Sequence, residues 1–437
     1  MTSPSPDPAT RAAFVPHSAP FQVASAEGAY LITPSGQRIL DAAGGAIVAN
    51  VGHGRREVAE AMARAAESAS YVVPPFTTPE RARLIDRLID RWLPRGVTRV
   101  MFTSGGSEGV EAALRLVRQH HLAAGRTGKW KTIGLDLSYH GVTLGALAVG
   151  NHAPRRAGME PLLVGFPHAP APYRILGAPA APDPADELER IILEEGPETV
   201  AAFIAEPVVG SAGGAMVPVE GYWQRARQLC DRYGMLLIAD EVMTGFGRTG
   251  KTWGVDHFGV TPDVLVSGKG LAGGYAPLCG VYATEAVVAP LAEQRQDVMF
   301  HTFAGAPSAC AAADVVLDIL EREDLVARCE RMGALLRQRL EETVGDHPNV
   351  GEIRGLGLMI GIELVKDRRT LERFPTEDRF AQRVQAQGLR RGVFYYAAGS
   401  GPVHDALLLG PPFTINGEDI DTLVNVLAES LSAAARG

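Results

Sequence analysis

The chain lacks the features that mark membrane, metal-binding or secreted proteins. Its 437 residues contain only four cysteines and no CxxC pair, so neither a zinc site nor a disulfide framework is indicated. No apolar run reaches the roughly eighteen residues that a membrane span requires. The first ten residues have neither a basic start nor an apolar core, which argues against a signal peptide. We therefore expect a cytoplasmic protein with no metal ion.

The sequence also lacks the patterns of nucleic-acid and nucleotide binding. Its 42 basic and 50 acidic residues give a net charge of −8, and no basic block stands out, so nucleic acid is not an expected partner. The glycine turn at 104–107, which joins a predicted strand to a helix, does not match GxGxxG, and this argues against a nicotinamide dehydrogenase. A P-loop is excluded at Lys269, because Asp263 stands where its first glycine should be and Gly270 follows the lysine.

Short apolar runs alternate with helical patterns along most of the chain. The runs predict buried strands at 100–103, 131–135, 199–205, 235–239 and 264–266. Strands separated by helices are typical of an α/β fold with a mostly parallel sheet between helices. Such a sheet has its functional groups at the carboxyl ends of its strands.

Three charged residues follow predicted strands directly: Glu206, Asp240 and Lys269. An acid after a strand is often part of a turn or a metal site, so none of them is decisive alone. Their convergence on one sheet edge favours a shared site. A lysine beside an aspartate suits pyridoxal 5′-phosphate (PLP), because the amine forms a Schiff base and the acid keeps the ring nitrogen protonated.

A glycine turn joins the strand at 100–103 to a helix and has the sequence Ser104-Gly105-Gly106-Ser107. Backbone N–H groups at a helix start bind anions, and glycine lets a phosphate approach closely. Tyr139 follows another strand, where it could stack on a flat ring or pack on the core.

Seven motifs, in order, resemble those of the class III aminotransferases of PLP fold type I. They cover the chain from about residue 20 to its end and are 104–108, 139–141, 206–208, 237–250, 267–270, 301–305 and 354–358. The resemblance implies a large domain and a smaller α/β domain. We expect a flexible arm at 1–20, a segment at 21–55 that packs with the small domain, a large PLP-binding domain at 56–320 and a small domain at 321–437.

The resemblance also implies roles for residues that contact the cofactor. Lys269 should form the Schiff base and move protons, and Asp240 should pair with the ring nitrogen. Tyr139 and Val242 should cover the two faces of the ring.

Further cofactor contacts follow from the same resemblance. Gly106 and Ser107 should hold the phosphate, with His140 and Glu206 beside the cofactor. Thr302 is similar to a residue that reaches the phosphate of the neighbouring subunit. This implies a homodimer with active sites at its interface; pairing of dimers into a tetramer stays open.

The implied reaction moves an amino group from an amine or ω-amino donor to a keto acid, pyruvate or 2-oxoglutarate, in two half-reactions. One alternative is an aminomutase, racemase or decarboxylase, because fold alone does not settle reaction. Another is a binding protein without activity, which the joint presence of Lys269 and Asp240 argues against.

The sequence departs from the family pattern where substrate carboxylates are bound. Some relatives have an arginine three residues before Pro411, where this chain has Leu408, and no arginine occurs at 397–404. Arg354, His404 or a residue of a partner subunit are the candidates to replace it.

Two further departures concern the pocket and the phosphate turn. Ile47 stands where an aromatic is common, which predicts a roomier pocket. Gly109 and Val110 stand where many relatives have Ala-Asn.

Overall fold

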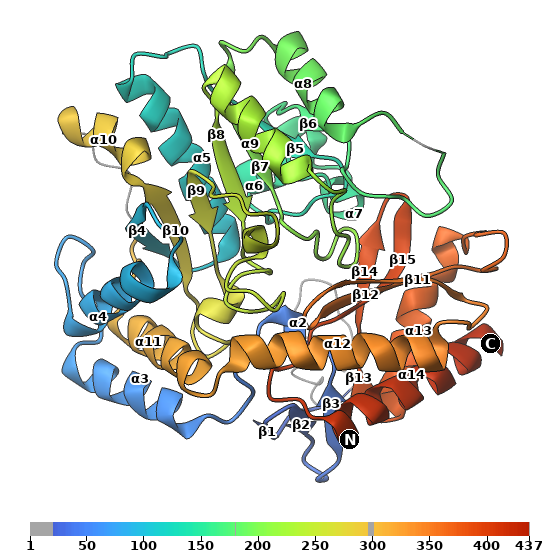
Figure 1. The fold of residues 1–437 in the computed structure, drawn as a ribbon. Coiled ribbons are helices and arrows are strands. Elements are labelled where there is room, and N and C mark those ends of the chain that lie inside the picture. The colour runs from blue at the N-terminus through green and yellow to red at the C-terminus, as the bar shows by residue number, and fades with distance from the viewer. Residues whose placement is uncertain (1–20, 180, 296–300, 437) are drawn as a thin grey trace, which may run out of the picture.

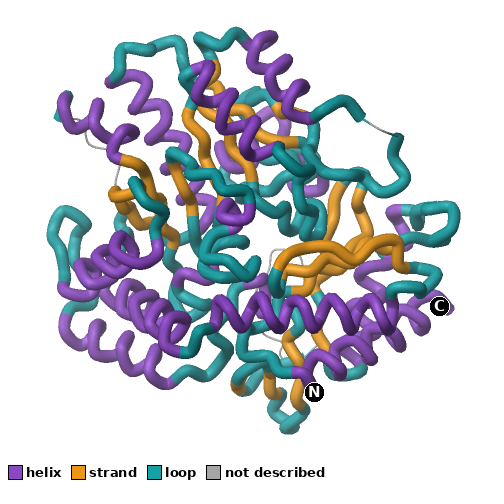
Figure 2. The backbone as a smooth tube through the Cα atoms, in the orientation of Figure 1, coloured by secondary structure: helices purple, strands orange, loops and turns teal. Residues whose placement is uncertain are grey.

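The computed structural model describes residues 21–179, 181–295 and 301–436. These residues form three β-sheets surrounded by helices (Figures 1 and 2). The arm predicted at 1–20 lies outside the described residues.

The largest sheet has seven strands in the order β4-β10-β9-β8-β7-β5-β6. Only β10 runs antiparallel to its neighbours, and the other pairs are parallel. The central strands β7, β8 and β9 are buried along their whole length, which explains their uninterrupted apolar sequences. The strands are β4 (Val97–Thr103), β5 (Lys131–Leu135), β6 (His168–Ala169), β7 (Val200–Ala205), β8 (Leu236–Asp240), β9 (Val264–Val266) and β10 (Cys279–Thr284).

Helices cover both faces of this sheet (Figure 1). α5 follows β4 and packs on it, and α11 lies beside α3 and α4. The helices of the chain up to residue 322 are α2 (Gly44–Ile47), α3 (Arg56–Ser68), α4 (Pro79–Arg87), α5 (Gly106–Ala123), α6 (Leu144–Val149), α7 (Ala153–Arg156), α8 (Pro184–Glu195), α9 (Tyr222–Tyr233), α10 (Glu285–Glu293) and α11 (Pro307–Arg322). The expected α/β architecture is thereby confirmed.

Two smaller four-stranded sheets complete the fold, in the orders β1-β2-β3-β13 and β11-β12-β15-β14. Their strands are β1 (Ser25–Glu27), β2 (Tyr30–Ile32), β3 (Arg38–Asp41), β11 (Val350–Leu356), β12 (Met359–Leu364), β13 (Val393–Phe394), β14 (Tyr396–Ser400) and β15 (Val403–Leu409). The accompanying helices are α12 (Leu325–Val344), α13 (Phe380–Arg390) and α14 (Gly417–Arg436).

The N-terminal segment joins the C-terminal part of the chain through the parallel pair β3–β13. The exact domain boundaries stay a prediction. Within the described ranges, no helix is long and apolar enough to cross a membrane, and no cluster of three His, Cys, Asp or Glu could hold a metal ion.

Candidate active site

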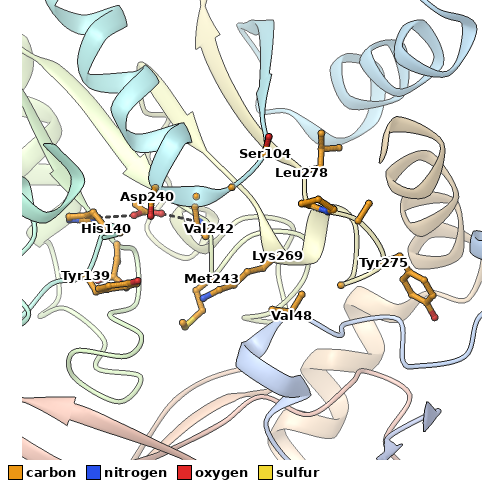
Figure 3. A pocket seen from close by; sticks show the side chains of 18 residues that line it. Val48, Ser104, Tyr139, His140, Asp240, Val242, Met243, Lys269, Tyr275 and Leu278 are labelled. Carbon is orange, nitrogen blue, oxygen red and sulfur yellow. Dashed lines mark hydrogen bonds and ion pairs between the residues drawn. The ribbon is translucent and has the colours of Figure 1, made fainter. Parts of the chain in front are cut away.

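A pocket of about 440 Å³ lies where the strands of the large sheet end and α5 begins (Figure 3). It combines the phosphate turn with the charged residues that follow β7, β8 and β9. Most residues predicted for the cofactor line it: Gly106, Ser107, Tyr139, His140, Glu206, Asp240, Val242 and Lys269.

Asp240 ends β8 and is held in place through both carboxylate oxygens. His140 Nδ1 lies 2.7 Å from Oδ2, and the Val242 N–H donates to Oδ1 at 3.1 Å (Figure 3). Burial alone lowers the pKa of His140, but the hydrogen bond and charge of Asp240 outweigh it, so this pKa is raised. The raised pKa favours the protonated form of His140, whose ring N–H then donates to the Asp240 carboxylate.

Lys269 follows β9 and Gly268, and its backbone has a positive φ of 37°. Burial lowers the pKa of its amine to about 8, against the opposing charges of Asp240 and Glu206. Its amine makes no hydrogen bond or ion pair with any residue that the structure describes. A lysine amine with a lowered pKa and no protein partner is suited to attack a carbonyl.

Glu206 follows β7 and acts as a brace for the pocket wall. Its Oε1 accepts the N–H of Tyr139 at 2.9 Å, and its Oε2 accepts the N–H of Gly210 at 2.9 Å. Burial raises the pKa of Glu206 to about 7. Through its two hydrogen bonds, Glu206 orients the backbone at Tyr139 and at Gly210 around the pocket.

The turn before α5 has the shape of an anion cradle. No side chain caps α5, so the first backbone N–H groups of the helix have no capping partner, and Gly105, Gly106 and Ser107 at its start line the pocket. Space is tight: a Cβ added at Gly106 would lie 3.0 Å from Val242 Cγ1, and one at Gly141 would lie 2.5 Å from Ser107 Oγ. Glycine at both positions keeps the cradle open, which fits a phosphate group.

Arg155 lies at the edge of this site and belongs to no motif of the sequence. Its guanidinium carbon lies 4.9 Å from the ring centre of Tyr139, and its charge contributes to the lowered pKa of Lys269. Arg155 is exposed and has no hydrogen bond or ion pair within the described ranges. Only the folded position of α7 reveals it, because nothing in the local sequence distinguishes Arg155 from Arg156.

The three candidate substrate residues, Arg354, His404 and Ile47, do not line this pocket, and their roles in substrate binding stay predictions. Arg354 is buried; its guanidinium binds Glu352, Glu363 and the carbonyls of Gly213 and Gly214. His404 Nε2 lies 2.9 Å from the carbonyl of Phe374.

Ile47 is buried and packs against Gly410, while its neighbour Val48 lines the pocket. The roomier pocket predicted from Ile47 therefore lacks a structural basis. Thr302 is exposed on a loop outside the pocket of its own chain.

Comparison with known proteins identifies the family to which the chain with this site belongs. The family model described as aminotransferase class III matches residues 13–431. The chain belongs to the class III aminotransferases.

Relatives of this class III aminotransferase span almost its whole length. An aminotransferase of Schizosaccharomyces pombe is 39% identical, covering 96% of this chain and 94% of that protein. The putrescine–pyruvate aminotransferase of Pseudomonas aeruginosa is 34% identical, covering 94% and 91%. The omega transaminase of Pseudomonas jessenii, solved in complex with PMP, has a TM-score of 0.92 at 30% identity over 99% of each chain.

This class III aminotransferase is thus an enzyme that transfers amino groups, and its family depends on PLP. The comparisons do not favour the aminomutase, racemase or decarboxylase alternative.

Proposed function

We propose that this enzyme binds PLP in the pocket at Lys269 and moves an amino group from an amine or ω-amino donor to a keto acid, pyruvate or 2-oxoglutarate. The observation that carries the proposal is the unpartnered Lys269 amine, with its pKa lowered to about 8, between Asp240 and the glycine cradle. When bound, PLP supplies an electron-withdrawing ring that stabilises negative charge on the substrate carbon.

Asp240 keeps its orientation through its hydrogen bonds with His140 and Val242. Asp240 would hold the ring nitrogen of PLP through a charge-assisted hydrogen bond, which is stronger than a neutral one. Tyr139 and Val242 enclose the ring, and their apolar surfaces exclude water from the reacting carbon.

Lys269 performs the proton transfer. Its neutral amine removes the proton from the carbon that carries the donor's amino group, which requires a pKa near the working pH. Burial supplies that pKa.

The first turn of α5 holds the phosphate through backbone N–H groups and the Ser107 hydroxyl. Thr302 is exposed on its own chain, and we assign it to the phosphate of a partner subunit in a homodimer.

Arg155 is the residue that we assign to the carboxylate of the keto acid. It is cationic, exposed and unpaired within the described residues, and it contacts the ring that walls the pocket. A guanidinium binds carboxylates in bidentate fashion. This assignment replaces Arg354 and His404.

We infer the donor class from the lack of a second arginine that could bind a substrate carboxylate, and from the donor named for one relative. Among the described residues no arginine lines this pocket, and Arg155 contacts Tyr139 in its wall. The P. aeruginosa relative is named for a diamine donor, putrescine. We therefore expect amines and ω-amino compounds to be better donors than α-amino acids.

The test is the visible spectrum of purified enzyme during titration with donors in the absence of an acceptor. We expect absorbance of bound PLP that borohydride fixes covalently to Lys269 and that Lys269→Ala lacks. Amines should convert the spectrum to that of the amine form of the cofactor, and pyruvate should restore it. A protein that takes up no PLP would contradict the proposal, and bound PLP that no donor converts would favour the mutase, racemase or decarboxylase alternative.

A further inference from the structure

Arg81, on α4, uses its whole guanidinium to hold two loops together. Nε donates to the Gly305 carbonyl at 3.0 Å, and Nη2 donates to the same oxygen at 2.9 Å. Its remaining carbonyl contacts are Val72, Pro74, Phe76 and Ala304, at 2.5 to 3.3 Å. Arg81 is buried and has no ion pair within the described part of the chain.

The two helices beside these loops do not need Arg81 to stay in contact. Arg87, two turns along α4, pairs with Asp314 at 2.7 Å and with Glu321 at 2.9 Å on α11. Trp92 Nε1 donates to Glu321 at 2.7 Å. Figure 1 shows α4 and α11 side by side. The contacts of Arg81 therefore serve the loops at 71–76 and 301–305.

These two loops present apolar side chains to solvent. Phe76 is 67% exposed, Phe303 64% and Tyr71 44%, and the rings of Tyr71 and Phe303 meet edge to face at 6.2 Å. Aromatic side chains that are exposed together on one surface are typical of a protein–protein interface. Thr302 stands beside Phe303 on the same surface.

We propose that Arg81 is a positioning residue that acts in trans: it fixes the loops that one protomer lends to the PLP site of a second copy of this chain. The proposal rests on the proposed function, because it requires the homodimer and the phosphate contact of Thr302. Loss of Arg81 leaves the pocket of its own protomer complete and disturbs that of its partner.

The first test compares the Arg81→Lys variant with wild type. A lysine keeps the charge but has no planar fork, so it cannot hold both loops. We expect an intact dimer by light scattering, a PLP dissociation constant raised about tenfold and an activity lowered about tenfold. The matched control is Arg83→Lys, because Arg83 lies on the same helix with its side chain 58% exposed; it should behave like wild type.

The decisive test uses a hybrid dimer of one Arg81→Lys chain and one Lys269→Ala chain, isolated through two different tags. Only the Arg81→Lys chain keeps Lys269, so the hybrid has one competent PLP site. The loops that reach this site come from the Lys269→Ala chain, in which Arg81 is intact. We expect about half the wild-type activity per dimer and one tightly bound PLP, with wild-type affinity. If Arg81 acts within its own protomer, the hybrid will remain as weak as the Arg81→Lys homodimer, and the proposal is overturned.

A second variant perturbs the same contact from the loop side. Gly305 has φ +63°, and a Cβ there would lie 2.8 Å from Arg81 Nε. Gly305→Ala should therefore disturb the same contact, and a hybrid with Lys269→Ala should again recover activity and PLP affinity at its one site with Lys269. This pair tests the proposal even if Arg81→Lys does not fold. Wild-type enzyme that is monomeric or takes up no PLP would refute the proposed function itself. If the wild-type enzyme binds PLP but the hybrid dimers are as weak as the variant homodimers, only the role of Arg81 is refuted.

Discussion

His140 Nδ1 lies 2.7 Å from Asp240 Oδ2, and both side chains are buried. Because we propose that Asp240 pairs with the cofactor nitrogen, this contact gives His140 a proposed role in orienting that carboxylate. Because the second oxygen of Asp240 accepts the Val242 N–H, the carboxylate can rotate only if it loses a hydrogen bond.

Replacement of His140 by Phe should leave Asp240 short of one donor. We expect the free energy of unfolding of the apo-enzyme to fall by about 1–3 kcal/mol. The pKa of His140 is raised, so its contribution is complete below the ordinary value of 6.5 and is lost as the pH rises through the raised value. Urea unfolding of both proteins should thus give a difference that shrinks with increasing pH. A difference that grows with pH would show that His140 is neutral beside Asp240.

The lowered pKa of Lys269 predicts the pH dependence of cofactor capture. Only the neutral amine attacks the aldehyde, so the rate at which apo-enzyme captures PLP should rise with pH. It should level off above about 8, and not near the ordinary 10.5. Stopped-flow absorbance measures this rate. A rate still rising tenfold per pH unit at pH 9 would contradict the lowered pKa.

Much of the fold and the grouping of Glu206, Asp240 and Lys269 could be predicted, because each residue directly follows a buried strand. The carboxyl ends of parallel strands lie at one edge of the sheet, so the local apolar runs were sufficient to predict that the residues after them lie close together. The same is true of the glycine turn before α5. The catalytic and binding roles of these residues remain predictions.

The rest of the site depends on contacts between distant segments, which no local pattern encodes. Arg155 is near the pocket because α7 folds back over Tyr139. Arg354 was a reasonable carboxylate ligand by residue type, yet the buried Glu363 and two carbonyls occupy its guanidinium. Only the three-dimensional structure distinguishes an available arginine from an occupied one.

Two buried carboxyl groups should make the enzyme less stable as the pH rises from about 4.5 to about 7. Burial raises the pKa of both Glu206 and Glu241 from 4.5 to about 7. The folded state then binds more protons than the unfolded state in this window, so stability falls with increasing pH. Glu241→Gln should flatten that slope in urea unfolding. An unchanged slope would show that Glu241 is already ionised in the folded enzyme.

Arg155→Met should impair the keto acid half-reaction selectively. We expect the KM for pyruvate to rise about tenfold, because one charge-assisted contact is lost. An aldehyde acceptor, which has no carboxylate, should keep its KM. The control is Arg64→Met, since Arg64 is 67% exposed on α3 and its nearest ion pair is 3.9 Å long. Equal losses for pyruvate and the aldehyde would remove Arg155 from carboxylate recognition.

The glycine at position 109 is explained by the sulfur of Cys279. A Cβ on Gly109 would lie 2.3 Å from Cys279 Sγ and 3.0 Å from Val266 Cγ1. Alanine is a better helix former by about 1 kcal/mol, yet overpacking a buried contact costs about 1–3 kcal/mol.

We therefore expect Gly109→Ala to destabilise the enzyme, although it places a better helix former in α5. Cys279→Ala removes the obstructing sulfur and alone should cost about 1 kcal/mol through the cavity it leaves. Because the two changes compensate in volume, the double variant should be more stable than the sum of the single effects predicts, by about 1–2 kcal/mol. Urea unfolding of the four proteins measures this coupling. Strictly additive effects would mean that Val266, and not Cys279, excludes a side chain from position 109.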